Sequence, residues 1–516
     1  MKEQEITRAG VIDIGTHSIK LFIAEKDGDD IKKIESLKNV APLGNDTFFK
    51  ERITQETMNK TIAILEKYSN KLKEYAITDI KIIATTAVRE ATNKDIFIDT
   101  VYRRTGFNIE VLTVGDVSYY IDAYLSQKLK DKYPIHTKNL IIAELGSGSL
   151  DVSVMSQGLS LLNIGMPLGT LRIKQLMGKL GGSMRDTFDA VEENVDNEFS
   201  YLKREIPAIN IDDVVLIDET YSSYLQKILS KNTSDSFFKL SAAETQNLIE
   251  KIMNTNIEDL AREYKIPIEN VDMFPPYAII LNAFTKSTEG KNIYILEVPL
   301  AEAVLADMLL NVKISQKYNK TNQLISIANS ICKKFNADIK HARQVAFLSE
   351  IFFNNFKEVL GLKNEDLLYL LLASYLHDIG MFVYTRSHHK HSEYIILNLN
   401  LFRLNNEEIK IIACCARYHR KNTPAESHFI YNSLPKDKQM LIQKLSSILR
   451  LANALDSSHK QKVKKLEIKF NRNQNITLTV TVPGNFLLEK TDFEEKKILL
   501  EDISGNKLNL KIQYEA

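Results

Sequence analysis

The chain has 516 residues, and its 67 basic and 66 acidic side chains leave a net charge of only +1. This balance does not favour a general nucleic-acid or membrane surface, so we expect neither as a partner. No apolar run approaches the roughly 20 residues that span a bilayer, and the N-terminus lacks an apolar signal core. The three cysteines form no disulfide framework, which fits a reducing compartment. We therefore expect a soluble, cytoplasmic protein of several domains.

An internal repeat is the clearest organisational feature of the sequence. Its two copies are VIDIGTHSIKLFI (11–23) and IAELGSGSLDVSV (142–154). Aligned without gaps, they place Asp13 over Glu144 and Gly15 over Gly146. Each copy is an apolar strand, an acidic residue, a turn of small residues and a second strand. Chance similarity of two glycine turns is the alternative. The repeat predicts two lobes of the same topology, with Asp13 and Glu144 in equivalent places.

Between the copies, the pattern alternates between helix and strand. Residues 54–75 have helical spacing, residues 79–93 indicate a strand, a turn and the start of a helix, and residues 109–116 indicate a strand and a turn. Such alternation is typical of α/β lobes. We expect one α/β lobe at 1–125 and a second at 126–310, closed by a helix at 299–310.

The rest of the chain changes character twice. Residues 311–460 repeat apolar positions every three to four residues and are poor in glycine, which predicts an all-α domain. Residues 461–516 contain alternating strand patterns, with turns at 471–473 and 505–506, which predicts a small β-rich domain.

The two turns of the repeat are candidate phosphate sites. Small residues let backbone N–H groups approach an anion, and Ser and Thr hydroxyls add donors. The candidates are Gly15, Thr16, His17, Ser18, Gly146, Ser147, Gly148 and Ser149. Asp13 and Glu144, at the ends of strands, would hold a divalent cation that bridges phosphate oxygens. Arg89 follows a strand and could bind phosphate through both guanidinium arms. Turn capping by the acids, and a surface salt bridge for Arg89, are the alternatives.

The predicted helical domain holds eight of the ten histidines. His341, the His377-Asp378 pair and Asp456 follow the order H…HD…D, and such side chains are ligands for a divalent metal. Between them lies a group that could form a track for a polyanion. It consists of His388, His389, Lys390, Arg417, His419, Arg420 and Lys421. The alternative for the histidines of this domain, the metal candidates included, is a solvated basic face together with packing residues.

These motifs, in this order, resemble the exopolyphosphatase/guanosine-pentaphosphate phosphohydrolase family. The two repeat copies resemble its phosphate loops, ATTAVREATN its A-T-x-A-x-R motif, and MPLGTLRI its P-L-G-x-x-R segment. LHDIG, HHKHSEYII, RYHRK and LRLANALD resemble the helical domain of its longer members. The resemblance implies an acetate-kinase/actin-like fold for both lobes, an HD-like helical domain, a cytoplasmic homodimer and Mg²⁺ dependence. It also implies hydrolytic release of the terminal phosphate of polyphosphate or guanosine pentaphosphate.

The sequence departs from the family pattern at three places, and these decide which residues the resemblance marks as catalytic. In VGDVSYY, Asp116 falls at the first of two family acids and Val117 at the second, the general base, and valine cannot take a proton. Glu144 replaces the aspartate of the second phosphate loop. Asp218-Glu219-Thr220 replaces a G-G-T turn, so that two acids would repel phosphate. The resemblance thus leaves Glu144, Asp116 and Arg89 as the catalytic candidates.

Two other functions stay open on the sequence alone. One is a non-catalytic relative that binds polyphosphate or guanosine polyphosphate as a sensor, which the Val117 and Glu219 departures favour. The other is a phosphohydrolase that acts through a second divalent metal in the helical domain.

Overall fold

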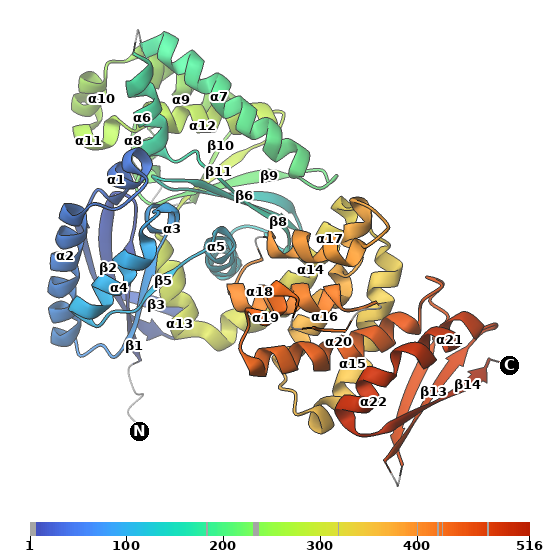
Figure 1. Ribbon diagram of the computed structural model, residues 1–516. Coiled ribbons are helices and arrows are strands. Elements are labelled where there is room, and N and C mark those ends of the chain that lie inside the picture. Colours follow the sequence, from blue (N-terminus) through green and yellow to red (C-terminus); the bar gives the residue numbers. More distant parts are fainter. Residues whose placement is uncertain are drawn as a thin grey trace. The chain divides into compact units, whose positions relative to one another are not determined.

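The computed structural model describes residues 7–181, 184–230, 237–317, 319–399, 401–420, 423–425, 427–471 and 474–515. The chain divides into two units, residues 1–320 and 321–516 (Figure 1). Within the described residues, no helix is long and apolar enough to cross a membrane.

The first lobe is built on a five-stranded sheet of order β3-β2-β1-β4-β5. Its strands are β1 (Arg8–Ile14), β2 (Ser18–Asp27), β3 (Asp30–Val40), β4 (Asp79–Ala84) and β5 (Ile109–Val111). Its helices are α1 (Leu43–Lys50), α2 (Gln55–Glu74), α3 (Thr86–Glu90) and α4 (Lys94–Thr105). The hydroxyl of Thr54 caps the N-terminus of helix α2, and the apolar face of this helix, including Ile62 and Leu65, packs into the core of this lobe.

The second lobe is built on a six-stranded sheet of order β10-β11-β9-β6-β7-β8. Its strands are β6 (Asn139–Leu145), β7 (Leu150–Ser156), β8 (Leu159–Met166), β9 (Asp213–Asp218), β10 (Phe237–Leu240) and β11 (Ile293–Glu297). Its helices are α6 (Thr170–Leu180), α7 (Met184–Glu205), α8 (Ser222–Ile228), α9 (Ala242–Asn254), α10 (Ile257–Tyr264), α11 (Ile268–Val271) and α12 (Phe274–Ser287). Helix α12 packs between α7 and α9 and contributes Phe274 and Phe284 to the core beneath the sheet.

The two sheets confirm the predicted duplication. In each, the first two strands form an antiparallel hairpin, and the first strand pairs in parallel with the strand that follows a long crossover. Asp13 lies opposite Lys20 in the first hairpin, and Glu144 lies opposite Asp151 in the second. The lobes therefore share one topology, and the second adds the edge strand β10.

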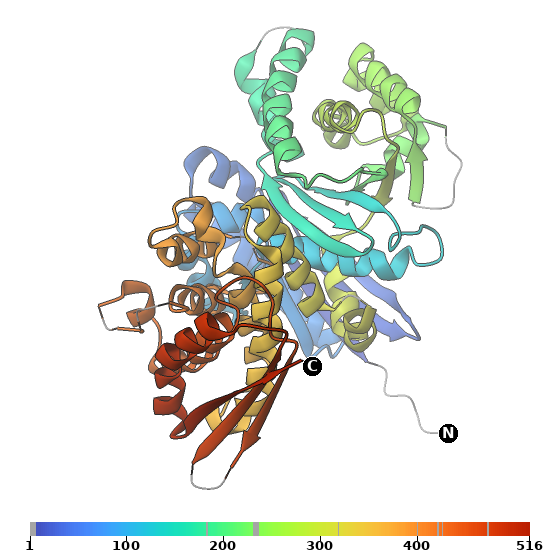
Figure 2. The same cartoon turned by 90° about the vertical axis from the view of Figure 1, so that its right-hand side faces the viewer.

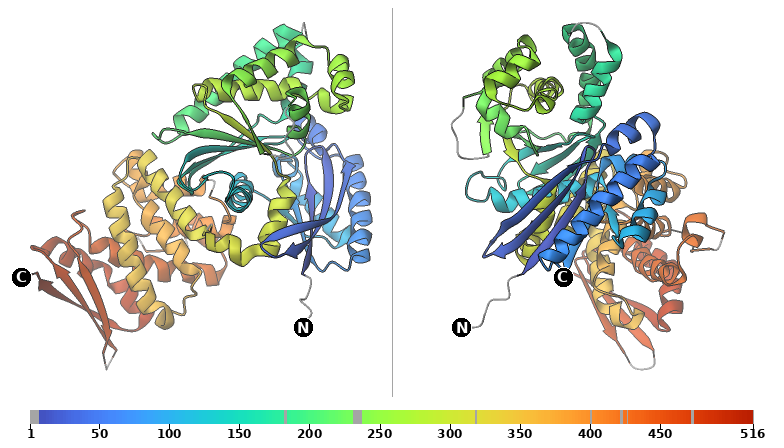
Figure 3. Two further views of the ribbon diagram at one scale, coloured as in Figure 1. Left: turned by 180° about the vertical axis from the view of Figure 1, so that it is seen from behind. Right: turned by 90° about the vertical axis from the view of Figure 1, so that its left-hand side faces the viewer.

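Two helices are placed differently from the sequence-based expectation. Helix α5 (Val114–Lys128) begins where a turn was expected, because Thr113 and Asp116 form a capping box at its N-terminus. Helix α13 (Leu300–Lys317) was expected to close lobe II, yet it packs against β1, β2 and β3 of the first sheet and against α5 (Figure 3). Its buried residues, such as Leu300 and Val304, give it an apolar surface that the first sheet covers.

The second unit is mainly helical, as predicted, and ends in a small sheet. Its helices are α14 (Lys320–Lys334), α15 (Ile339–Leu360), α16 (Asp366–Leu376), the short η1 (Ile379–Phe382), α17 (His388–Leu397), α18 (Asn406–Arg417), α19 (Phe429–Asn432) and α20 (Lys436–Ala454). The terminal elements are β12 (Lys465–Phe470), β13 (Asn475–Val482), α21 (Leu487–Lys496), α22 (Ile498–Ser504) and β14 (Lys507–Tyr514).

The terminal segment joins the helices instead of standing apart from them. Strand β13 pairs antiparallel with β12 and parallel with β14, and α21 and α22 form the crossover between β13 and β14 (Figure 2). Strand β12 contacts α15, while α21 and α22 contact α20. Two residues of the turn expected at 471–473, Arg472 and Asn473, lie outside the described residues. The terminal segment thus supplies side chains to the helical core.

Candidate functional site

A small pocket in the first unit brings the two repeat turns together. Its volume is about 70 Å³, room for a terminal phosphate but far below the roughly 300 Å³ of a typical ligand site. Both turns line it, together with residues from the ends of β4 and β9. The lining residues from the turns are Gly15, Thr16, His17, Ser18, Gly146, Ser147, Gly148 and Ser149. All eight candidate phosphate-binding residues therefore face one pocket.

The two turns have the same backbone geometry. The Gly15 N–H donates to Ser18 O, and the Gly146 N–H donates to Ser149 O, both at 3.0 Å. The turns approach each other closely at Gly148, where a Cβ atom would lie 2.7 Å from Thr16 Oγ1. Only glycine lets the second turn approach the first this closely.

Four carboxylates and one lysine supply the charge of the pocket. The acids are Asp13, Glu144, Asp151 and Glu219, and Lys20 forms a close ion pair with Glu219. Lys20 Nζ also lies 4.0 Å from Asp13 Oδ2. The described lining therefore carries more negative than positive charge, which favours a bound cation.

The acids respond to burial and to one another. Burial raises the pKa of Asp13 to about 7, although the charge of Lys20 opposes this. Burial, and next the charge of Asp151, raise the pKa of Glu144 well above its ordinary value. Burial also raises the pKa of Asp151 to about 6. Without a cation, burial thus makes the charged form of these three acids less favourable than it is in water.

The donor set fits a magnesium ion. Among the described residues, Asp13 Oδ1 and Asp151 Oδ1 are buried oxygens without a hydrogen-bond partner. Unpaired buried carboxylate oxygens are costly, and hard oxygen donors are what Mg²⁺ prefers. Asp13 and Glu144 lie at the ends of the equivalent strands β1 and β6, where an ion could reach both.

Lys20, Asp151 and Glu219 were not among the candidates from the sequence. Lys20 and Asp151 lie directly across the hairpins from Asp13 and Glu144, so the aligned repeat contained the signal that identifies them. Glu219 was read as a source of repulsion alone. In the structure, Lys20 pairs with it and lowers its pKa against the opposing effect of burial.

Asp218, the other acid of this turn, has a different role. It accepts hydrogen bonds from the backbone of Thr220, Tyr221 and Ser222 at the start of α8 and from the Tyr277 hydroxyl. It therefore stabilises the turn and does not line the pocket.

Two of the three catalytic candidates lie outside the pocket lining. Asp116 Oδ2 accepts hydrogen bonds from the Thr113 N–H at 3.0 Å and hydroxyl at 2.8 Å, so its carboxylate caps α5. Val117, the next residue, does line the pocket, as its place in the family motif implies. Arg89 donates to Leu112 O at 2.8 Å and lies 3.9 Å from Asp151. Arg89 thus lies beside Asp151, one of the pocket acids. Of the three catalytic candidates, only Glu144 lines the pocket.

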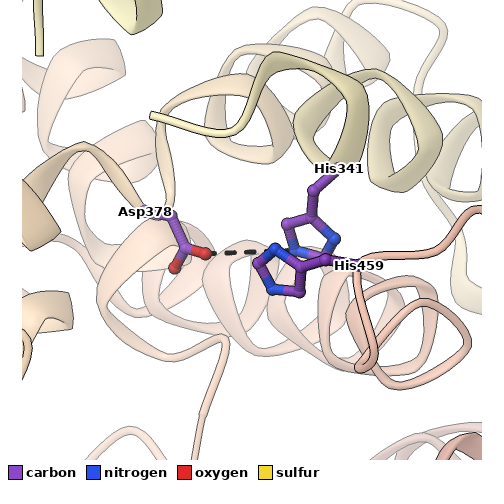
Figure 4. A group of neighbouring side chains, drawn as sticks. All are labelled: His341, Asp378 and His459. Carbon is purple, nitrogen blue, oxygen red and sulfur yellow. Dashed lines mark ion pairs between the residues drawn. The ribbon is translucent and has the colours of Figure 1, made fainter. Parts of the chain in front are cut away.

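The second unit contains a buried cluster of histidines around Asp378. His341, His377, Asp378 and Asp456 come together, as the H…HD…D order predicts, and His388 and His419 join them. His459 stacks on His341 with ring centroids 3.6 Å apart (Figure 4). Two groups of side chains here could hold a metal ion: His341 with Asp378 and His459, and His377 with Asp378 and His419.

Asp456 orients a histidine instead of facing Asp378. Its Oδ2 lies 2.8 Å from His341 Nδ1, and its Oδ1 accepts a hydrogen bond from the Gln461 N–H at 2.7 Å. Both oxygens are thus engaged. A carboxylate that holds the far nitrogen of a ligating imidazole fixes its tautomer. Asp456 is therefore engaged with His341 and Gln461 here, and its role as a metal ligand stays a prediction.

The expected polyanion track separates into unlike environments. His388 and His419 are buried in the cluster, and Arg417 is paired with Glu393. Lys390 is exposed, while His389 is half-buried. Arg420 is exposed and lines a separate pocket beside the cluster, and Lys421 lies outside the described residues. These side chains therefore do not form one continuous face.

Comparisons with known proteins cover both units. Residues 22–312 match the Ppx/GppA phosphatase family, and residues 324–502 match its domain III. The chain is 22% identical over 416 residues to the guanosine-5′-triphosphate,3′-diphosphate pyrophosphatase of Pseudoalteromonas translucida, covering 80% of each chain. It is 32% identical over 177 residues to the bifunctional 3-dehydroquinate synthase/phosphatase of Fusobacterium nucleatum, covering 32% of this chain and 25% of that protein.

A solved structure shows the same fold in the lobes. The exopolyphosphatase of Cytophaga hutchinsonii superposes with a TM-score of 0.52 at 19% identity, over 60% of this chain and 99% of that one. The first unit therefore has the two actin-like lobes that the sequence predicts. Since the family match spans more than half of the chain and the domain III match most of the remainder, the chain belongs to the Ppx/GppA phosphatase family.

Proposed function

We propose that this protein hydrolyses the terminal phosphoanhydride bond of inorganic polyphosphate or guanosine pentaphosphate in the pocket of the first unit. The observation that carries the proposal is the meeting of two glycine-hydroxyl turns around facing, partly unpaired carboxylates. The family membership and the names of its relatives, a guanosine pentaphosphate hydrolase and an exopolyphosphatase, support the substrate class. The pocket volume of about 70 Å³ suits a single terminal phosphate group.

Mg²⁺ fits the acids of this pocket. Asp13 and Glu144 would hold it, with Asp151 as a further oxygen donor, and it would neutralise charge on the phosphate oxygens. The hydroxyls of Thr16, Ser18 and the second turn would donate to the same oxygens. Lys20 would contact phosphate once it leaves Glu219.

Water activation is the weak point of the site. Glu144 is the remaining pocket acid among the catalytic candidates, and we assign it the role of holding the attacking water. Val117 occupies the position of the family base and offers only an apolar wall. A general base contributes roughly 10²–10⁴-fold, so we expect slow turnover that depends on positioning and charge neutralisation.

Orthophosphate release tests the proposal. The purified chain is given polyphosphate or guanosine pentaphosphate, with Mg²⁺ or with a chelator. We expect slow release that requires Mg²⁺ and that Glu144→Gln removes. Glu25→Gln is the matched control, because Glu25 is a paired surface acid of the same unit and lies away from the pocket.

Two results would contradict hydrolysis in this pocket. If a measurable activity survives Glu144→Gln unchanged, the reaction takes place elsewhere in the chain. If no release occurs but either substrate binds tightly, the protein is a sensor of these polyanions. The homodimer and the cytoplasmic location implied by the family resemblance stay predictions, which light scattering and cell fractionation would check.

A further inference from the structure

A row of charged side chains crosses the first sheet and leads out of the acidic pocket of the first unit. Asp13 on β1 lies opposite Lys20 on β2, and Lys20 in turn lies opposite Lys38 on β3. Residues that lie opposite each other in antiparallel strands point to the same side of the sheet. Asp13 and Lys20 line the pocket, whereas Lys38 lies on the edge strand and is exposed. The row therefore runs from the interior of the pocket to its outside.

Electrostatic effects place Lys38 near the mouth of this pocket. His17 lines the pocket and is also exposed to solvent, so it marks the mouth. Partial burial lowers the pKa of His17, and three nearby ammonium groups lower it further. They belong to Lys38, Lys174 and Lys60. Burial acts to raise the pKa of Glu219, another lining residue, but nearby lysines that include Lys38 outweigh this effect and lower it. Lys38 thus acts on two residues of the pocket wall.

The sign of the charge changes between the interior of the pocket and its mouth. Inside, the described lining holds four acids beside Lys20, which suits a metal ion. At the mouth, Lys38 and Lys60 are exposed near His17, which suits an anion. Like charges directly opposite each other, such as Lys20 and Lys38, destabilise a sheet, and a bound anion would offset that effect. An exposed lysine on an edge strand can also serve only to prevent pairing with another sheet, a role that is independent of substrate.

A substrate with several phosphates must extend through this mouth. The pocket volume of about 70 Å³ suits one phosphate group, so the second phosphate of a phosphoanhydride lies outside. This second phosphate is the leaving group when water attacks the terminal phosphorus, and it gains negative charge as its bond to that phosphorus breaks. A fixed cation beside the leaving group stabilises this charge in the transition state. Lys38 is placed to supply such a cation.

Building on the proposed function, we propose that Lys38, together with the His17 imidazole, binds the second phosphate of the substrate and makes the site selective for phosphoanhydrides over phosphate monoesters. His17 contributes the N–H of a neutral imidazole. The oxygen of water bonds to the terminal phosphorus, and the bond from this phosphorus to the bridging oxygen breaks. The shortened chain leaves with the electron pair of that bond, while one water proton passes to solvent and the other stays on orthophosphate. A monoester has no second phosphate and gains nothing from Lys38.

Calorimetry of the full chain tests the second-phosphate site. The chain is titrated, at one fixed excess of Mg²⁺, with orthophosphate and with methylenediphosphonate, whose carbon bridge resists hydrolysis. We expect the parent to bind the diphosphonate about tenfold more tightly than orthophosphate, because Lys38 adds a charge-assisted contact. Lys38→Met should lose this gain and keep the affinity for orthophosphate, while Lys38→Arg should retain most of the gain.

Lys32→Met is the matched control for this titration. Lys32 lies on the same edge strand, its side chain is 65% exposed, and it pairs with Glu25 away from the pocket lining. This variant should bind both probes as the parent does, and circular dichroism verifies that each variant is folded. Equal affinity of the parent for the two probes would overturn the second-phosphate site. Parent-like affinity of Lys38→Met for the diphosphonate would overturn it too, and would leave Lys38 as a residue that only protects the sheet edge.

A comparison of two substrates tests the effect of Lys38 on the leaving group. Orthophosphate release is measured with tripolyphosphate and with p-nitrophenyl phosphate, a monoester. We expect Lys38→Met to lower kcat for tripolyphosphate about tenfold and to leave the slower monoester reaction unchanged. An equal fall for both substrates would assign Lys38 to the terminal phosphate and overturn the proposal. If the parent releases no phosphate from either substrate, hydrolysis in this pocket is wrong, and the calorimetric comparison alone decides whether Lys38 binds a second phosphate.

Discussion

Lys20 of the first lobe and Glu219 of the second form an ion pair inside the acidic pocket. The family resemblance leads us to expect a glycine turn where Glu219 stands. The Glu219 carboxylate therefore pairs with Lys20, the cation that would otherwise be free to bind a phosphate. We therefore expect Glu219 to compete with a bound phosphate for Lys20.

Removing the charge of Glu219 should free Lys20 for phosphate. We expect Glu219→Gln to bind polyphosphate about tenfold more tightly, since a like charge in a buried site costs several kcal/mol before screening. Lys20→Met should weaken binding by a similar factor. Calorimetric titration measures both. Glu25→Gln, which removes an acid from a surface ion pair, should leave the affinity unchanged. Parent-like affinity in Glu219→Gln would show that the ion pair does not compete with substrate.

The repeat made the first unit predictable in unusual detail. Because the hairpins share one register, the alignment of Asp13 with Glu144 also placed Lys20 over Asp151. Glu219 could not be found this way, because its position depends on how β9 pairs with β6, far along the chain. The packing of α13 on the first sheet could not be predicted either. It requires the chain to come back from the second lobe to the first, and local periodicity does not show where a helix packs.

The histidines of the second unit show a different limit. His388, His389 and His391 are neighbours in the sequence, and composition alone makes them alike. Only the packing of α17 against α18 decides that His388 meets His419 in the interior while Lys390 stays exposed. The order of motifs predicted that His341, His377, Asp378 and Asp456 lie together, but not that His388 and His419 join them.

The glycine at the contact of the two turns should be intolerant of a methyl group. Gly148→Ala would place Cβ 2.7 Å from Thr16 Oγ1 and 3.1 Å from Thr86 Cβ. Relief of such a contact typically costs 1–3 kcal/mol, and here it would move the phosphate turns apart. We expect a lower unfolding temperature and loss of Mg²⁺-dependent phosphate release.

Gly178 is the control for this substitution. It lies within α6, and a Cβ there meets nothing within 4 Å. Gly178→Ala should stabilise the chain by about 0.5–1 kcal/mol, because alanine is the better helix former. Calorimetric unfolding of both variants makes the comparison, and equal effects would contradict the role of Gly148 in the close approach.

Asp218 should make the first unit less stable as the pH rises. Burial raises the pKa of Asp218 to about 6, above its ordinary value of 3.8. Between these values the folded state binds more protons than the unfolded state, so the unfolding free energy falls as pH rises from about 4 to 6. Asp218→Asn keeps one oxygen for the three backbone N–H donors, places its amide nitrogen against the Tyr277 hydroxyl, and removes the titration. Relative to the parent, it should gain about 1–3 kcal/mol between pH 4 and pH 7.

Scanning calorimetry at several pH values measures this difference. Asp99→Asn is the control, since Asp99 forms an exposed ion pair with Arg103 and should follow the parent closely. Parallel profiles for Asp218→Asn and the parent would show that Asp218 titrates normally.

Val117 is the position at which catalysis can be restored. It lines the pocket from the first turn of α5, and the capping box of Thr113 and Asp116 fixes that turn. A glutamate there would reach toward the phosphate turns from a rigid helix end, while Asp116 keeps its structural role. We expect Val117→Glu to raise Mg²⁺-dependent phosphate release by about 10–100-fold, less than the full range for a general base because the added acid also repels substrate. Val117→Gln has nearly the same shape and no basic oxygen, so it should stay at the parent rate. Steady-state kinetics should place the gain in kcat, since proton removal acts on the chemical step.

A gain shared by both variants would mean that side-chain volume, and not a base, limits the parent. Equal, unchanged rates would mean that another step, such as the release of Lys20 from Glu219, limits turnover.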